Sequence, residues 1–462
     1  MAGPTGVTIR TYQVGFGDCF LLTFRYAGAK VRNVLIDFGT TGLPARLGIS
    51  AAAHMTKIAK LIAKDCGADE GSGKQGKLHA VVATHRHRDH ISGFATSGKN
   101  GGSGGIIARL EPDVIVQPWT EHPKAALGAL TAPGDGKGFL RFRAGLDAMH
   151  AVAQAVVGFA RRELDRPDGS GVSRALLERL AFIGEDNVKN LSAVKNLIAM
   201  GSRQGAKGVY TSYRKPSGLE RVLPGVEVTV LGPPTLRDTS DIRKQRSRDP
   251  DEFWHLLAGA RRFAGGRALL KGIGLSPTLG RKDARGVAGP PLPPQARWFA
   301  DRLEALRGSQ LLQIVTALDT ALNNTSLILL FEFGGRRLLF PGDAQLENWS
   351  YALRDVKDAA KNVDLVAGVD VYKVGHHGSL NATPKTLLWQ HLKKRKKPGA
   401  ARLRTLLSTM PGKHGSTKSR TEVPRRPLLD ALEAETVLVN THAFKLGTTQ
   451  PTLSQAIELE AR

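Results

Sequence analysis

The chain alternates between short apolar runs bounded by polar turns and longer stretches with helical spacing. Near the N-terminus, apolar runs at residues 19–24, 33–37 and 80–83 each have the length of a buried strand and end at polar or glycine-containing turns. Residues 49–65 differ, because their apolar side chains recur at helical spacing and Gly67 follows as a stop signal. This pattern predicts strands and helices in alternation.

The middle of the chain differs in composition and in the spacing of its apolar residues. Residues 123–221 carry apolar stripes at helical spacing, and residues 236–320 are basic, polar and rich in glycine and proline. An alternating run at residues 226–231 predicts a single strand between them. Before these segments, the five glycines between Gly98 and Gly105 predict a flexible loop.

The last third of the chain returns to the strand pattern. Two apolar runs flank Gly334-Gly335 and predict a hairpin. The predicted elements here are strands at residues 326–333, 337–340, 369–374, 403–407 and 435–439, and helices at residues 346–356 and 428–433. Acidic and histidine residues stand at the ends of several strands. Such an order predicts an α/β layered fold with a site along one sheet edge.

One short segment carries most of the candidate chemistry. Residues 84–90 read T-H-R-H-R-D-H and directly follow the apolar run at residues 80–83. His85 and His87 are two residues apart, so their side chains point to the same side of an extended chain. Asp89 and His90 follow at the expected first turn of a helix. Imidazole and carboxylate ligands suit zinc, iron or manganese, and the segment therefore predicts a metal site.

Composition adds a bias toward polyanionic partners. The chain has 66 lysines and arginines against 41 acidic residues, a formal net charge of +25. Such an excess favours nucleic acid or another polyanion as a partner, although a solvated basic surface gives the same count. The two cysteines exclude a disulfide framework and suit a reducing cytoplasm. No apolar run reaches the roughly 18 residues of a transmembrane helix.

The order of motifs resembles the metallo-β-lactamase fold, an αββα sandwich of two mixed sheets. The resemblance lies in H-x-H-x-D-H at residues 85–90, Gly342-Asp343, and His376-His377-Gly378-Ser379. Three further stretches resemble the hydrolase domain of bacterial competence DNA-uptake proteins: Val14-Gly15-Phe16-Gly17-Asp18, Asn324-Thr325-Ser326-Leu327, and Lys373-Val374-Gly375 before the two histidines.

The resemblance also implies a division of the chain. Two halves of the core would be interrupted by a large, mostly helical and basic insertion. The implied segments are the N-terminal half of the core at residues 1–122, a helical insertion at 123–221, a core strand at 222–235, a basic insertion at 236–320 and the C-terminal half of the core at 321–462.

Carried over residue by residue, the resemblance implies a ligand set for one or two divalent ions, zinc or manganese. His85 and His87 would bind the first ion, Asp89 and His90 the second, and Asp343 would bridge both. His376 would complete the second site, because it comes first off its strand, while His377 would touch the leaving group. A third histidine for the first ion is missing, and His122 and Glu121 are the nearest candidates.

Two ions about 3.5–4 Å apart can hold a hydroxide and stabilise both oxygens of an in-line displacement. Asp89 is the candidate acceptor of the nucleophile's proton, and His377 the candidate donor to the departing oxygen. With the basic charge, this favours a metal-dependent hydrolase of phosphodiesters, including nucleic acid. Two alternatives stay open. They are a small-molecule ester or lactone hydrolase, and a nucleic-acid-binding protein with a degenerate metal site.

Overall fold

The computed structural model describes residues 2–69, 71–123, 161, 164–165, 191–235, 237–239, 323–392, 403–413, 422–446 and 451–462. The basic runs at residues 243–248 and 393–397 and the helical stripe at residues 146–157 lie outside these ranges. Within them the chain forms two mixed β-sheets with helices, as predicted for the α/β class.

The first sheet has seven strands in the order β13-β1-β2-β3-β4-β5-β6. Their bounds are β1 (Gly6–Tyr12), β2 (Cys19–Arg25), β3 (Val31–Phe38), β4 (Ala80–Val82), β5 (Val114–Pro118), β6 (Lys207–Thr211) and β13 (Ser454–Glu460). β1 pairs antiparallel with β13 and with β2, and β2 pairs antiparallel with β3. From β3 to β6 all pairs are parallel, so β4 and β5 end at the same sheet edge.

The second sheet has six strands in the order β12-β11-β10-β9-β8-β7. Their bounds are β7 (Glu227–Gly232), β8 (Ile328–Phe333), β9 (Arg336–Phe340), β10 (Val371–Lys373), β11 (Arg404–Leu407) and β12 (Val437–Asn440). β7, β8 and β9 pair antiparallel, and β9 to β12 pair parallel. Apart from β13, the two sheets therefore repeat one plan of three antiparallel strands followed by three parallel ones.

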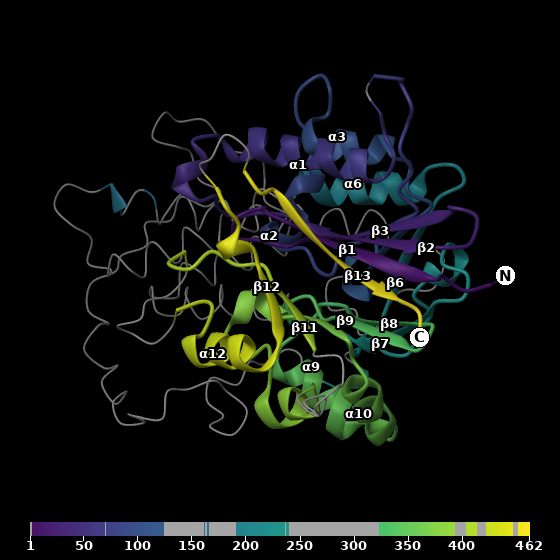
Figure 1. Ribbon diagram of the computed structural model, residues 1–462, viewed down its shortest axis with the longest axis vertical. Helices are drawn as coiled ribbons and strands as arrows, with labels where there is room; N and C mark the ends of the chain where they lie inside the picture. The colour runs from purple at the N-terminus through teal and green to yellow at the C-terminus, as the bar shows by residue number, and fades with distance from the viewer. Residues whose placement is uncertain are drawn as a thin grey trace, which may run out of the picture.

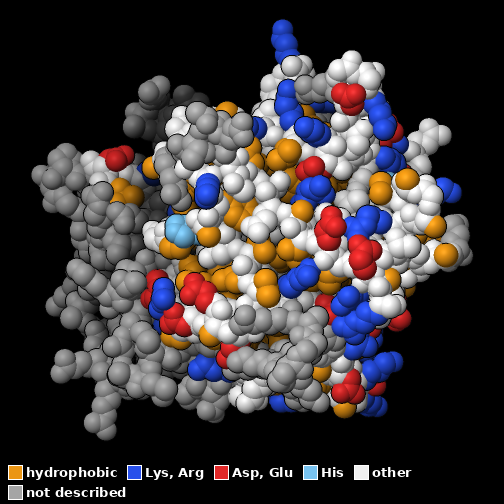
Figure 2. Space-filling view, in the orientation of Figure 1, with side chains coloured by type: hydrophobic (Ala, Val, Ile, Leu, Met, Phe, Trp, Pro, Cys, Tyr) orange, Lys and Arg blue, Asp and Glu red, His pale blue; other side chains and the backbone are white. Residues whose placement is uncertain are grey.

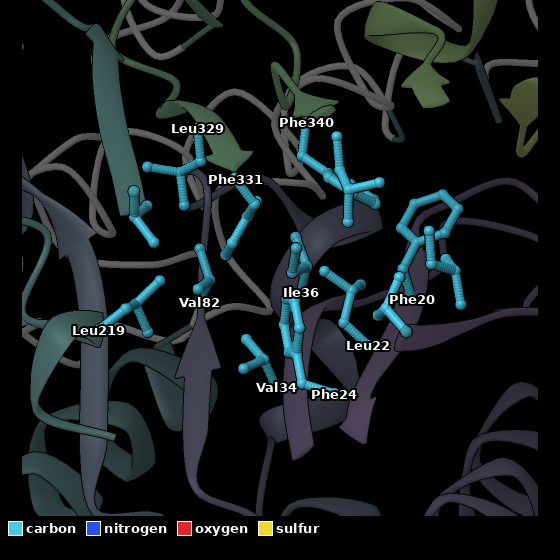
Figure 3. Packing of buried hydrophobic residues seen from close by; sticks show 14 of the residues in the cluster. Phe20, Leu22, Phe24, Val34, Ile36, Val82, Leu219, Leu329, Phe331 and Phe340 are labelled. Carbon is cyan, nitrogen blue, oxygen red and sulfur yellow. The ribbon is translucent and has the colours of Figure 1, made fainter. Parts of the chain in front are cut away.

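Three apolar clusters stack the sheets and helices into layers (Figure 1). One lies between the sheets and includes Phe20 and Phe24 from the first, and Phe331 and Phe340 from the second, which point toward one another in Figure 3. The second cluster joins the first sheet to α1 (Ala51–Asp65), α3 (Gly102–Arg109) and α6 (Leu191–Ser202). The third joins the second sheet to α9 (Leu346–Ser350), α10 (Ala359–Ala367) and α12 (Arg426–Glu435).

Burial explains why the layers are stable. Each fully buried phenylalanine or leucine stabilises the fold by about 1.5–3 kcal/mol relative to an exposed one. The Phe20 and Phe340 rings lie 5.7 Å apart in an edge-to-face arrangement across the sheet interface. α1 is set by local signals as well, since the Ser50 hydroxyl accepts a hydrogen bond from the Ala53 amide at its N-terminus.

The structure corrects the predicted loop at residues 98–105. Residues 102–105 form the first turn of α3, and only the preceding residues form a turn. The glycines permit close packing rather than flexibility, because a Cβ at Gly104 would lie 2.1 Å from the Phe94 carbonyl oxygen. Composition alone does not distinguish these two uses of glycine.

Three further elements differ from the expectations. The range assigned to the helical insertion ends with α6 and the strand β6, both of which pack with the first sheet. β13 was not expected at all. Its residues alternate only weakly, and it occupies a sheet edge where most of its side chains are exposed or half-buried.

Candidate metal centre

The predicted ligands gather where strands of both sheets end. β4 leads into the histidine segment, whose residues Arg88–Ile91 form the short helix α2. β9 leads to Asp343, and β10 leads to His376 and His377. The two sheets are tied together here, because the Leu327 amide donates to the Thr84 carbonyl oxygen at 2.9 Å. The site therefore lies between two sheets rather than on one.

One carboxylate oxygen is the centre of the group. Asp343 Oδ2 lies 3.0 Å from His90 Nε2 and 3.9 Å from His85 Nε2. It also lies 3.8 Å from His376 Nε2 and 3.9 Å from His377 Nε2. Four imidazole nitrogens from two chain segments thus face a single oxygen of an almost completely buried residue.

Asp89 completes a compact set of possible ligands. Its Oδ2 lies 3.0 Å from His377 Nε2, and its Oδ1 lies 4.0 Å from His90 Nε2. Ligand atoms of Asp89, His90, Asp343 and His377 all lie within 4.8 Å of one another, and all four residues are buried. Nitrogen and carboxylate oxygen donors in this number suit zinc or another first-row divalent ion.

The outer nitrogens of two imidazoles are already occupied. His90 Nδ1 lies 2.8 Å from Asp37 Oδ2, and His377 Nδ1 lies 2.9 Å from the Ser408 carbonyl oxygen. A carbonyl oxygen only accepts, so His377 carries a proton on Nδ1, and Nε2 is the nitrogen left for a metal ion. Metal-binding histidines in proteins are commonly oriented in this way.

Asp37 is itself held rigidly. The Thr84 amide donates to its Oδ1 at 2.7 Å, and the Thr84 hydroxyl donates to its Oδ2 at 2.7 Å. Asp37 stands at the end of β3 with a φ of 54°, a left-handed conformation that aspartate tolerates better than most residues. Asp37 therefore stands behind His90 and holds its ring.

The electrostatics follow from burying several charges together. Burial would lower the pKa of His90 and of His377, but the surrounding carboxylates outweigh it and raise both. Burial would likewise raise the pKa of Asp89 and of Asp343, but the facing imidazoles hold both below the usual range. A bound cation would take over this balancing role and release protons from the imidazoles.

The buried polar atoms fit a cation at this place. His85 Nε2, Asp89 Oδ1 and the close pair His90 Nε2 and Asp343 Oδ2 are buried and make no well-aligned hydrogen bond with any residue in the described ranges. Leaving such atoms without a partner costs about 1–3 kcal/mol each, and more for charged groups. A divalent ion among them would satisfy all four.

The first of the two implied sites is less complete. His85 and His87 lie with ring centroids 4.7 Å apart, and burial followed by the neighbouring histidines holds the pKa of His85 well below its usual range. Glu121 instead faces Arg86, with Arg86 Nε 2.8 Å from its Oε1. His122 packs its ring against Tyr210 at 4.7 Å. Neither candidate third ligand joins the compact set of the described residues.

The two adjacent histidines lie at nearly equal distances from Asp343 Oδ2 but differ in burial. His377 is fully buried and belongs to the compact set of possible ligands. The His376 side chain is 27% exposed and lies at the rim of the site. Both residues have positive φ, 43° and 52°, so the chain turns sharply between them. Position along the strand does not predict which of the two rings is more deeply buried.

Two buried charged residues beneath the ligands, Lys373 and Asp18, were not predicted as part of the site. Lys373 Nζ makes a very short contact with Asp18 Oδ2 and lies 3.5 Å from Asp343 Oδ1. Asp18 Oδ2 lies 3.6 Å from His90 Nδ1. Both residues belong to stretches that carried the family resemblance, and a charged residue inside such a stretch was the available signal.

Comparison with known proteins does not assign the chain to a family. No protein-family model matches the chain, and none of the curated proteins matches it. Among the helices of the described ranges, none has both the length and the apolar character needed to cross a membrane.

Proposed function

We propose that this protein is a metal-dependent hydrolase with a metallo-β-lactamase-like fold, acting on phosphodiesters. The observation that carries the proposal is the set of four imidazole nitrogens within 4 Å of Asp343 Oδ2. The two mixed sheets, with helices on their outer faces and the ligands at strand ends, agree with that fold. The motif order in the sequence supplies the rest of the argument.

Zinc or manganese is the proposed cofactor. Asp89, His90, Asp343 and His377 would hold one ion, and His85 and His87 with Asp343 would hold a second. Divalent ions in such a site act as Lewis acids on a phosphoryl oxygen and lower the pKa of a coordinated water. Because the group of His85, His87 and Asp343, the first of the two implied sites, has only three ligands among the described residues, we expect weaker metal binding there.

The protein's own groups then divide the proton transfers. Asp89 is an ionised carboxylate buried beside the ligands, and it is the proposed acceptor of the proton from the nucleophilic water. His377 shares a 3.0 Å contact with Asp89 and orients that carboxylate. His376, partly exposed at the rim, replaces His377 as the proposed donor to the departing oxygen.

The substrate class rests on charge. A formal net charge of +25 favours a polyanionic phosphodiester, with nucleic acid as the leading candidate. On the face in Figure 2, the described lysine and arginine side chains lie among acidic ones and form no continuous patch. The site and the net charge, rather than a visible groove, therefore carry this part of the proposal. Both cysteines are free, which suits the cytoplasm as the proposed location.

The test is metal content together with hydrolysis. Elemental analysis of purified protein is expected to find one to two equivalents of zinc or manganese. Hydrolysis of bis(p-nitrophenyl) phosphate and of a labelled oligonucleotide should be lost with a chelator and return on adding the metal. Asp343→Asn, which keeps the shape of the side chain, is the matched inactive control. Protein that neither contains nor takes up metal contradicts the proposal, as does hydrolysis that Asp343→Asn leaves intact.

A further inference from the structure

Lys373 is the one buried lysine among the described residues, with 2% exposure. It is the last residue of β10, and the alternation of the strand turns it, with Val371, toward the space between the two sheets. Tyr372 and Val374 point to the opposite side, into the apolar cluster with the outer helices. A lysine in such a place is costly unless its charge is paired and its three donors are used.

The ammonium group has a partner from each sheet. It donates to the Gly342 carbonyl oxygen at 3.0 Å and lies 3.5 Å from Oδ1 of the adjacent Asp343. Its shortest contact is with Asp18 Oδ2, from the loop that joins β1 and β2. Lys373 thus connects Gly342, the residue before Asp343, with Asp18 in a loop of the other sheet.

Asp18 extends the connection to the histidines. Its carboxylate lies 3.6 Å from Nδ1 of His90 and 3.6 Å from Nδ1 of His377. Its backbone is fixed as well, because the Asp18 amide donates to the Asp89 carbonyl oxygen at 2.8 Å. The Ser408 hydroxyl holds the same loop through the Gly17 carbonyl oxygen. Asp18 is therefore a fixed support beneath two of the proposed ligands.

We propose that Lys373 and Asp18 form a positioning pair that sets the orientation of Asp343 and thereby the metal affinity of the centre. This inference rests on the proposed metal site. Lys373 attracts Oδ1 of Asp343, which leaves Oδ2 directed at the four imidazoles. Without the ammonium the carboxylate can rotate, and the buried charge of Asp18 has no counter-charge beside it.

The size of the expected effect follows from other metal centres. Groups that orient ligands without binding the ion typically change metal affinity by about 10–100-fold when they are removed. A purely structural role for Lys373 predicts something else. The free energy of unfolding of the metal-free protein would fall, while the affinity and the ligand field of the bound ion stayed the same.

The experiment compares Lys373→Met with a matched variant in the same sheet. Methionine keeps the length of the side chain and removes its charge. Thr405→Val serves as the control, because Thr405 is buried on the neighbouring strand β11 and bonds Thr436, away from the ligands. Each protein is stripped of metal, checked for folding by circular dichroism, and titrated with Zn²⁺ in competition with a chromophoric chelator. The Co²⁺ form of each is then examined by visible absorption.

We expect Lys373→Met to bind Zn²⁺ about 10–100-fold more weakly and to show altered Co²⁺ ligand-field bands. Thr405→Val should lose stability but keep both properties of the wild type. If Lys373→Met is not recovered folded, Asp18→Asn carries the same test with the same expectation. Wild-type affinity and an unchanged Co²⁺ spectrum in the folded variant overturn the positioning role. Wild-type protein that binds metal but hydrolyses no phosphodiester overturns the proposed function alone.

Discussion

His90 and Asp37 lie 2.8 Å apart at the ends of neighbouring segments of the first sheet, with the imidazole Nδ1 against the carboxylate Oδ2. This contact decides which nitrogen of His90 is available to an ion. With Nδ1 bonded to Asp37, the ring presents Nε2 to Asp343 at 3.0 Å. Because Thr84 holds Asp37 through two hydrogen bonds, the orientation of His90 is set by the backbone at the end of β4.

The first prediction concerns this contact. Asp37→Ala is expected to weaken Zn²⁺ binding by about 10–100-fold, because His90 loses the partner that fixes its tautomer and ring orientation. Asp37→Asn retains a hydrogen-bond acceptor and should lose less. Zn²⁺ titration against a chelator measures both. Asp65→Asn, which alters a hydrogen bond to Tyr12 in the helix layer, is the control. Equal affinity in Asp37→Ala and wild type would contradict the assigned role.

The second prediction compares Asp343 with His122. Asp343→Ala should lower phosphodiester hydrolysis by about 10²–10³-fold, since a bridging carboxylate contributes several kcal/mol to holding the ions. His122→Ala should retain most activity, because that ring packs on Tyr210. Steady-state rates with bis(p-nitrophenyl) phosphate provide the comparison. Losses of equal size would identify His122 as the missing ligand of the first site.

The third prediction separates the two adjacent histidines. His377→Ala should lose bound metal, because His377 belongs to the compact ligand set. His376→Ala should keep its metal and lose turnover, as expected for a group that protonates the leaving oxygen. Metal content and kcat are measured on the same preparations. The reverse result, with metal lost only from His376→Ala, would restore the assignment based on strand order.

The fourth prediction concerns acid stability and lies away from the centre. Burial, followed by the nearby Arg32, lowers the pKa of His79 from 6.5 to about 4. The Asn33 amide donates to His79 Nδ1 at 3.0 Å, so the folded protein requires the neutral ring. The unfolded chain therefore binds the extra proton between about pH 6.5 and 4, and stability falls as the pH falls through that window.

A shift of this size corresponds to a loss of up to about 3 kcal/mol, complete near pH 4. His79→Asn replaces the accepting nitrogen with an amide oxygen and cannot be protonated. Urea unfolding at pH 7 and pH 4.5 should show a smaller pH-dependent loss in the variant than in wild type. An identical loss in both proteins would show that His79 does not contribute to it.

Local pattern determined most of the regular structure. The helix at α1 and the hairpin of β8 and β9 follow from apolar spacing, the Ser50 cap and the Gly334-Gly335 turn, all of which act within a few residues. The predictions that were wrong, or were not made, depend on distant partners. α3 uses glycines to approach Phe94, and β13 exists because it pairs with β1 across almost the whole chain.

The candidate site likewise combines features that local sequence shows with features that depend on distant residues. The types of residue that can bind a metal are evident from the sequence, because His85, His87, Asp89 and His90 stand together after one strand, and Asp343 and the two later histidines follow recognisable turns. The burial of His377 and the exposure of His376, and the positions of Lys373 and Asp18 beneath the ligands, became visible only in the folded structure. Residue type is local information, whereas the direction of a side chain at a sharp turn depends on what packs against it from the other sheet.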